Sequence, residues 1–149
     1  MIVRLVHRIL LKKIFNAQYF DYPKSLYAVI DCLRIGNLGS DSIVLDFFSG
    51  SSTTAHAVMQ LNAEDGGNRK YIMVQLPEET PEDSEARKAG YNTIPEIAKE
   101  RIRRAGKKIK EESPLTTQNL DTGFRVFRLA DSNFEEVKKA PSEYDQSKL

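Results

Sequence analysis

The sequence has 149 residues, of which 40% are apolar and 29% charged, and its formal net charge is +1. This length suits one modest domain and excludes several large ones, while the composition excludes wholesale disorder. The net charge excludes nucleic-acid binding driven by overall charge, so any such attraction must come from a local basic face. Cys32 is the single cysteine, which excludes a disulfide scaffold or a thiolate metal cluster and favours a reducing compartment, the cytoplasm.

Residues 1–19 form a lead-in whose first fifteen residues predict an amphipathic helix. Apolar residues recur there at helical spacing, and basic residues such as Arg4, Arg8 and Lys12 interrupt the run too often for a membrane span. The segment also lacks the small-residue cleavage site of a signal peptide. An anchor on a membrane surface is the less favoured alternative, and we expect no membrane partner.

The next elements follow the order helix, strand, helix. Leu26, Ile30 and Leu33 are spaced as in a helix that ends near Gly36 and Asn37. The apolar run Ser42–Phe48 predicts a buried parallel strand. The hydroxyl residues 51–54 can cap a helix over 55–61, with Ala57, Val58 and Leu61 facing inward.

The second half of the chain predicts another strand and a long helix. The segment 64–70 is rich in turn formers, and Tyr71–Leu76 predicts a strand, so the order strand, helix, strand implies a parallel sheet with a right-handed crossover. A polar loop follows, with a short helix around 84–88. Ile94–Glu112 predicts the longest helix, capped by Thr93, and Phe124–Leu129 a final strand. We expect residues 136–149 to be a flexible tail.

The segment from Asp46 to Thr54 carries the strongest functional indication. It places small residues where a strand of an α/β sheet leads into a helix, so a ligand can approach the backbone at Gly50 and the free N–H groups of the helix start. A phosphate-binding P-loop would require a Gly-Lys pair, and a dinucleotide fingerprint would require two further glycines. Both alternatives fail on the residues present.

The stretch Asp46 to Val58, DFFSGSSTTAHAV, is very similar to motif I of the β-group amino-methyltransferases. It is closest to the Mod subunits of type III restriction-modification systems, whose pattern is near D-F-F-[AS]-G-S-[GA]-T-T-A-H-A-V. FDYPKS at 20–25 resembles the family's motif X, NRKYIMVQLPE at 68–78 its second strand, and 93–105 and 123–134 the end of Mod subunits. The resemblance covers roughly residues 15–135.

This resemblance implies a partial Rossmann-like fold, with a doubly wound and mainly parallel sheet, whose residues 20–135 bind S-adenosylmethionine. It also implies the residues that contact this cofactor: Lys24 and Ser25 from motif X, Asp46, Phe47, Phe48, Ser49, Gly50, Ser51, Ser52 and Thr53 from motif I, and Gln75 on the ribose side. Two positions depart from the pattern. Ser52 replaces the second glycine of motif I, and Gln75 with Glu78 nearby stands where many methyltransferases have an acidic residue, which weakens the expected binding of the ribose.

The family's catalytic motif, [DNS]-P-P-[YFW], has no counterpart, because the sequence contains no Pro-Pro pair. In the β-group order this motif precedes motif X, so we expect truncation upstream of residue 15 and no methyl transfer by this chain alone. The implied partners are DNA in the context of a complete enzyme, the N-terminal methyltransferase half and a restriction subunit. A gene fragment, a frameshifted remnant and half of a split enzyme all fit the residues.

Several simpler interpretations stay open. Asp46 can serve as a turn cap, Lys24 as a surface lysine and His56 as a packed side chain, and no spacing of ligands predicts a metal site. A basic cluster in the long helix predicts a solvated face rather than a phosphate-binding one; its members are Lys99, Arg101, Arg103, Arg104, Lys107, Lys108 and Lys110. The rival function is a non-enzymatic dimerisation or docking module, and a third alternative is an unstable fragment.

Overall fold

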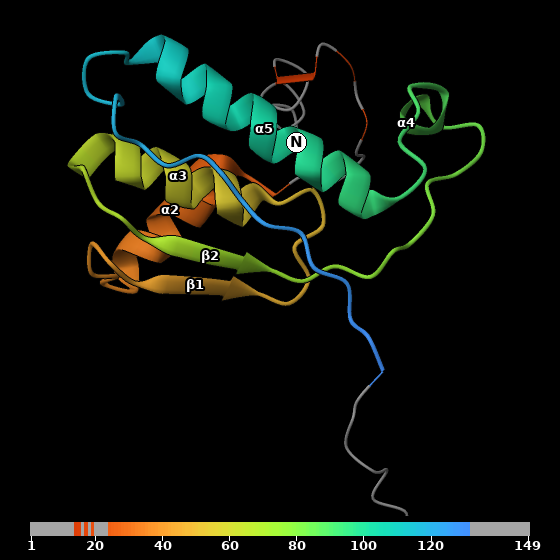
Figure 1. Cartoon of the computed structure of the whole chain (residues 1–149), viewed down its shortest axis with the longest axis horizontal. Helices are drawn as coiled ribbons and strands as arrows, with labels where there is room; N and C mark the ends of the chain where they lie inside the picture. The colour runs from red at the N-terminus through yellow and green to blue at the C-terminus, as the bar shows by residue number, and fades with distance from the viewer. Residues whose placement is uncertain (1–13, 16, 18, 20–23, 132–149) are drawn as a thin grey trace, which may run out of the picture.

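The computed structural model describes residues 14, 15, 17, 19 and 24–131, and Figure 1 shows their arrangement. Along the chain the elements are α2 (Leu26–Ile35), β1 (Ile43–Asp46), α3 (Thr53–Asp65), β2 (Lys70–Met73), α4 (Glu85–Lys88) and α5 (Ile94–Glu112). Most of the predicted N-terminal helix, motif X residues 20–23 and the predicted tail 136–149 lie outside the described residues.

Helix α2 begins and ends where its sequence predicts. The Ser25 hydroxyl accepts a hydrogen bond from the Ala28 N–H at 3.2 Å, which satisfies one of the free donors of the first turn. The helix ends at Gly36, and Asn37 takes a left-handed conformation with a φ of 49°. The chain then reverses into β1.

The two strands form a parallel pair in the register Ile43 to Lys70 through Asp46 to Met73. Helix α3 connects them, which confirms the predicted order of strand, helix and strand in a parallel sheet. Both strands are shorter than predicted, since β1 ends at Asp46 and β2 at Met73. The described residues therefore form a mixed helix and strand fold with one small parallel sheet.

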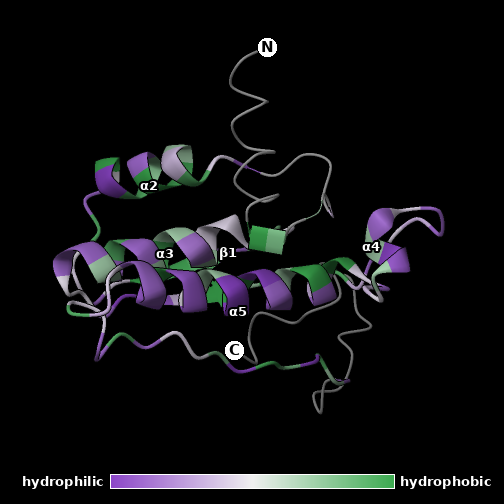
Figure 2. Cartoon of the chain, turned by 90° about the horizontal axis from the view of Figure 1, so that it is seen from above, coloured by the Kyte–Doolittle hydropathy of each residue, from purple (hydrophilic) through white to green (hydrophobic). Residues whose placement is uncertain are grey.

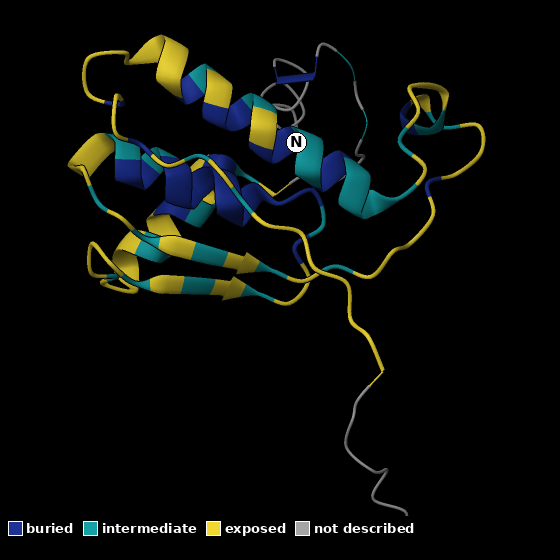
Figure 3. Cartoon of the chain, viewed as in Figure 1, coloured by how far each residue is buried: buried dark blue, intermediate teal, exposed yellow. Residues whose placement is uncertain are grey.

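Helix α3 lies at the centre of the packing, between α2 and α5 (Figure 2). It is buried nearly all round, as the dark blue ribbon in Figure 3 shows, and the predicted inward residues Ala57, Val58 and Leu61 are all buried. On one side Ala57 and Leu61 pack against α2. On the other side its residues join the main cluster with α5, which consists of Ala55, Met59, Ile102, Ala105, Ile109 and Leu120.

The prediction that β1 is a buried strand is wrong, because Ile43 and Leu45 are exposed and Val44 and Asp46 are only partly buried. Tyr71 and Met73 pack against the cluster between α3 and α5. Because side chains alternate along a strand, Leu45 and Ile72, which are paired in the register, point to the opposite face. They are 48% and 51% exposed, and Ile43 is exposed as well. No described residue covers this face, whereas a central parallel strand is usually covered on both.

The helices after β2 agree with the sequence. α4 is capped by Ser84, whose hydroxyl accepts from the Arg87 N–H at 3.1 Å. At the start of α5 the Glu96 carboxylate accepts from the Thr93 N–H at 3.1 Å, the reciprocal arm of a capping box. Among the described residues no helix is both long and apolar enough to cross a membrane.

The predicted final strand, Phe124–Leu129, is not formed. Just before this segment, Thr122 lies so close to Gly106 of α5 that a Cβ on that glycine would stand 2.7 Å from it. The Phe124 ring packs below the Arg103 guanidinium at 5.5 Å. Alternating apolar residues make a strand only where a neighbouring strand accepts their hydrogen bonds, and the one sheet of the described residues pairs β1 with β2 alone.

Candidate functional site

The predicted ligand-binding turn leads from the carboxyl end of β1 into α3, at residues 47–52. Two of its residues have left-handed backbone conformations, Gly50 with a φ of 51° and Ser52 with a φ of 57°. The Ser52 N–H donates to the Ser49 carbonyl oxygen at 2.7 Å, which closes the loop on itself. Glycine adopts such angles freely and serine does not, so the backbone at Ser52 is strained.

Asp46 holds this turn from the strand side. Its carboxylate accepts from the Phe48 N–H at 3.1 Å and from the Thr54 hydroxyl at 2.6 Å. The Lys24 ammonium lies 3.9 Å from the same carboxylate, which brings motif X and motif I together as the resemblance implies. The alternative that Asp46 organises the turn is therefore confirmed, and a contact with a ligand stays a prediction.

Gln75 holds the turn from the segment just after β2. Its side-chain oxygen accepts from the Gly50 N–H at 2.8 Å, and its side-chain nitrogen donates to Glu78 at 3.1 Å. One residue earlier, the Val74 carbonyl oxygen accepts from the Ser49 N–H at 3.1 Å. Gln75 thus braces the backbone at Gly50, and its amide is already engaged at both ends.

The predicted site residues divide into a buried and an exposed group. Ser49, Ser51, Ser52 and Thr53 are buried and form the inner wall of the turn. Phe47 and Phe48 are 64% and 80% exposed, and Lys24 is exposed beside them. Ser25 serves α2 as its cap, as described above. A ligand at this turn would meet Phe48, Gly50 and Lys24 first.

Arg101 belongs to the inner wall of the turn, which sequence reasoning missed. We predicted it on the solvated basic face of α5, and this prediction is wrong, because Arg101 is 1% exposed. Its Nη1 donates to the Ser51 hydroxyl at 2.8 Å and to the Thr53 hydroxyl at 2.7 Å. Burial lowers the pKa of Arg101 to about 10, so the guanidinium keeps its charge at neutral pH. Its spacing was the available indication, since Arg101 lies four residues after Ile97 and four before Ala105, on the same side of the helix.

His56 is packed, as expected, and not poised for catalysis. Its side chain is buried on α3, and burial lowers its pKa to about 3, with the charges of Arg101 and Lys108 acting in the same direction. The imidazole is therefore neutral near pH 7, and its Nδ1 has no partner among the described residues. Within that part of the chain, no group of three or more acidic, histidine or cysteine side chains could hold a metal ion.

The remaining basic residues of α5 are largely paired with glutamates on the same helix. Glu100 pairs with both Arg103 and Arg104, and Lys107 and Lys108 pair with Glu111 and Glu112 at distances of 3.7 and 3.6 Å. These pairs at three- and four-residue spacing are typical of a solvated helix face.

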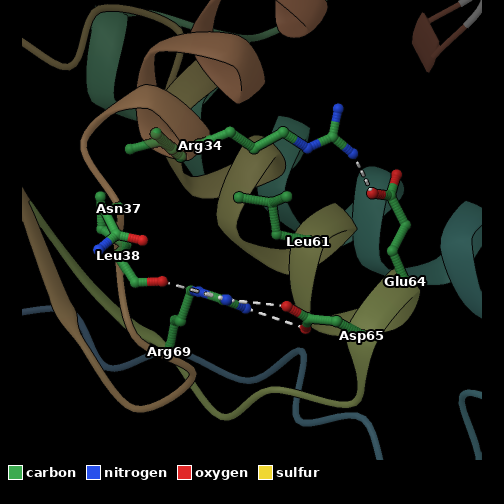
Figure 4. A pocket seen from close by; sticks show the side chains of 8 residues that line it. Arg34, Asn37, Leu38, Leu61, Glu64, Asp65 and Arg69 are labelled. Atoms are coloured by element: carbon green, nitrogen blue, oxygen red, sulfur yellow. Dashed lines mark hydrogen bonds and ion pairs between the residues drawn. The ribbon is translucent and has the colours of Figure 1, made fainter.

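A cavity of about 260 Å³ lies at the opposite end of the strands, where α2 and α3 end (Figure 4). Its charged groups are engaged with each other: Arg34 bonds to Glu64 at 2.7 Å, and Arg69 bonds to Asp65 at 2.8 Å. These contacts fix α2 and the start of β2 against α3. The cavity therefore has a structural explanation and is separate from the turn.

Comparisons with known proteins show relatives among restriction-modification methyltransferases. The type III restriction-modification enzyme StyLTI Mod subunit of Salmonella typhimurium is 44% identical over 117 residues, which cover 78% of this chain and 18% of that protein. The EcoP15I Mod subunit of Escherichia coli is 38% identical over 152 residues, which cover 91% of this chain and 22% of that protein. The chain is a homologue of part of the type III Mod subunits. No protein-family model matches it.

The likeness extends to a methyltransferase outside the type III systems. The type II methyltransferase M.KpnI of Klebsiella pneumoniae is 39% identical over 93 residues, which cover 60% of this chain and 21% of that protein. The Mod-like chain thus spans between 18% and 22% of the length of these relatives. The activities of the complete relatives therefore belong to proteins that are several times longer than this chain.

Proposed function

We propose that the turn from Asp46 to Thr54 binds the methionine end of S-adenosylmethionine, within a partial Rossmann-like methyltransferase fold. The observation that carries this proposal is the place of the turn. It follows the carboxyl end of a parallel strand and ends at the start of α3, the position where open α/β sheets bind nucleotide ligands. Asp46 at the end of β1 and Gln75 just after β2 hold it by hydrogen bonds.

The residues of the turn fit such a cofactor in chemical terms. Gly50 carries no Cβ, so the backbone can approach a ligand closely. The exposed Phe48 ring offers an apolar surface, and the Lys24 ammonium is a partner for the carboxylate of the methionine moiety. Gln75 and Glu78, which are bonded to each other, would meet the ribose hydroxyls. Ser49, Ser51, Ser52 and Thr53 support the turn from inside.

In the wider context we propose that this chain is the cofactor-binding C-terminal portion of an adenine-N6 DNA methyltransferase of a restriction-modification system. Its relatives' names support this role. Because the sequence has no Pro-Pro motif, the groups that hold the target adenine must come from the N-terminal half of such an enzyme. DNA, that half and a restriction subunit are then its partners, and the cytoplasm its compartment.

Calorimetric titration of S-adenosylmethionine into the full chain tests the cofactor site. We expect binding in the unchanged protein and its loss in Asp46→Ala and Gly50→Val, because the first removes the brace and the second forces a β-branched residue into a left-handed angle. Asp41→Ala, in the exposed loop before β1, is the control for the first. Gly90→Val is the control for the second, since Gly90 also has a positive φ but lies far along the chain. Absence of binding by the folded, unchanged chain would refute the proposal.

The exposed sheet face supports a second candidate, a docking module without cofactor affinity. Ile43, Leu45 and Ile72 form an apolar surface that a partner could cover. Sedimentation over a range of concentrations separates the two functions. The docking function would be favoured if the chain associated with itself, lost this association in Leu45→Asp and bound no S-adenosylmethionine.

A further inference from the structure

We infer that Arg101 is the positioning residue of the cofactor turn, and that it acts by clamping the two residues on either side of the strained Ser52. This inference rests on the proposed function. Ser52 has a φ of 57° and makes no capping bond with its side chain. A serine keeps such an angle only where its surroundings impose it.

The contacts of Arg101 supply this constraint. One nitrogen, Nη1, donates to the hydroxyl before Ser52, that of Ser51, and to the hydroxyl after it, that of Thr53. The same nitrogen lies 3.5 Å from the Ser51 carbonyl oxygen. A guanidinium presents its donors in a fixed plane, so these contacts set the distance between residues 51 and 53 and with it the path through Ser52.

The burial of Arg101 indicates that this residue is held in place by its hydrogen bonds to the turn. A charged side chain that is 1% exposed normally pairs with a carboxylate, because the loss of hydration is otherwise uncompensated. Among the described residues no acidic side chain pairs with Arg101, and its Nε has no acceptor. The hydroxyls of the turn are therefore its hydrogen-bonding partners, and an ordinary apolar residue would fill the same space at lower cost.

The position of the clamp determines which part of the cofactor it affects. In the proposed site the turn at 50–53 receives the methionine end, whereas Gln75 and Glu78 lie on the ribose side. Loosening the turn should weaken binding of the methionine moiety and spare the adenosine moiety. A probe that lacks the amino-acid part, 5′-methylthioadenosine, distinguishes the two.

The test compares Arg101→Met and Arg101→Lys with Lys107→Met, which removes one exposed charge from the same helix. The first measurement is hydrogen exchange of the Ser52 and His56 amides, which donate to Ser49 and Ser52, against that of Gly66, which donates to Asn62 at the far end of α3. We expect faster exchange at Ser52 and His56 in Arg101→Met, partial recovery in Arg101→Lys, and no change at Gly66 or in Lys107→Met. Equal acceleration at all three amides, or none in a folded variant, would overturn the inference.

The second measurement is the affinity of each variant for the two probes. We expect Arg101→Met to lose about tenfold or more in affinity for S-adenosylmethionine, the effect of hydrogen bonds from a charged donor. The affinity for 5′-methylthioadenosine should change by less than about threefold on the same scale. Equal losses for both probes would overturn the assignment to the methionine side.

Two further arms keep the outcomes separable. Ser51→Ala removes one acceptor and leaves Arg101 in place, so it provides the same readouts if Arg101→Met does not fold. A third result is faster exchange at Ser52 and His56 in the variants together with no binding of S-adenosylmethionine by the unchanged chain. This result would support the clamp and reject the proposed cofactor site. If every variant bound S-adenosylmethionine as tightly as the unchanged chain does, the result would support the cofactor site and reject the clamp.

Discussion

Asp46, Gln75 and Arg101 reach the same turn from three elements, and each acts on a different group. Asp46 accepts from the backbone at Phe48 and from Thr54, Gln75 accepts from the backbone at Gly50, and Arg101 donates to hydroxyls. Asp46 and Gln75, which were predicted as ligands of the cofactor, thus hold the turn by hydrogen bonds, as Arg101 does. A change at any of them alters the backbone before it alters a contact with a ligand.

Ser52 provides a direct test of strain in this turn. We expect Ser52→Gly to raise the free energy of unfolding by about 1 kcal/mol, since glycine adopts the observed left-handed angle without the clash of a Cβ. Urea denaturation measures the change. Ser52→Ala is the matched control, because it removes the hydroxyl but keeps the Cβ. Equal stability of the two variants would show that the serine angle is not strained.

His56 makes the stability of the fold depend on pH in a defined direction. Its pKa is about 3 in the folded chain, against an ordinary value of 6.5. Between these two pH values His56 is therefore protonated in the unfolded chain and neutral in the folded chain. The free energy of unfolding should therefore fall by about 1.4 kcal/mol per pH unit from this group as the pH drops from 6.5 towards 3. Denaturation curves of the unchanged chain and His56→Gln should diverge over this range. Parallel curves would contradict the prediction.

At the scale of elements, helices were predicted well because their information is local. The bounds of α5 follow from its apolar spacing and from Thr93, and α2 was predicted from its apolar spacing; the serine caps of α2 and α4 were found only in the structure. The strand at 124–129 was predicted from alternation alone and does not form, since a strand depends on a neighbour that no local pattern specifies. The burial of β1 failed for the same reason: its apolar run gives no indication of what covers each face.

The two faces of the sheet should respond differently to truncation. Ile102→Ala, in the cluster between α3 and α5, should lower the free energy of unfolding by about 2–5 kcal/mol. Leu45→Ala, on the exposed face, should change it by no more than about 0.5 kcal/mol. Thermal or urea denaturation of both variants provides the comparison. A large loss in Leu45→Ala would mean that this face is covered in solution.

At the scale of the whole molecule, the sequence predicted the place of the turn but not all the residues that hold it. The place of the turn and the approach of Lys24 to Asp46 follow from residues near in sequence or from the resemblance. Arg101 lies 50 residues from Ser51, in a run of basic residues that all resemble one another in sequence. Only its phase on α5 sets it apart, because position 101 lies four residues after Ile97 and four before Ala105, which are both buried.

The whole chain should bind its cofactor without transferring the methyl group. Incubation with labelled S-adenosylmethionine and adenine-containing DNA should give no labelled adenine, since the sequence has no Pro-Pro motif to hold the flipped base. A DNA adenine methyltransferase of known activity serves as the positive control. Labelled N6-methyladenine made by the purified chain would contradict this prediction.

The distance in sequence between the turn and Arg101 also sets an order of events during synthesis. The strand, the turn and α3 leave the ribosome before α5, so the hydrogen bonds from Arg101 to Ser51 and Thr53 cannot form until the chain beyond residue 101 has emerged and docked. In the proposed site, S-adenosylmethionine therefore cannot guide the folding of the first half of the chain. It can only stabilise a chain that has already folded through α5.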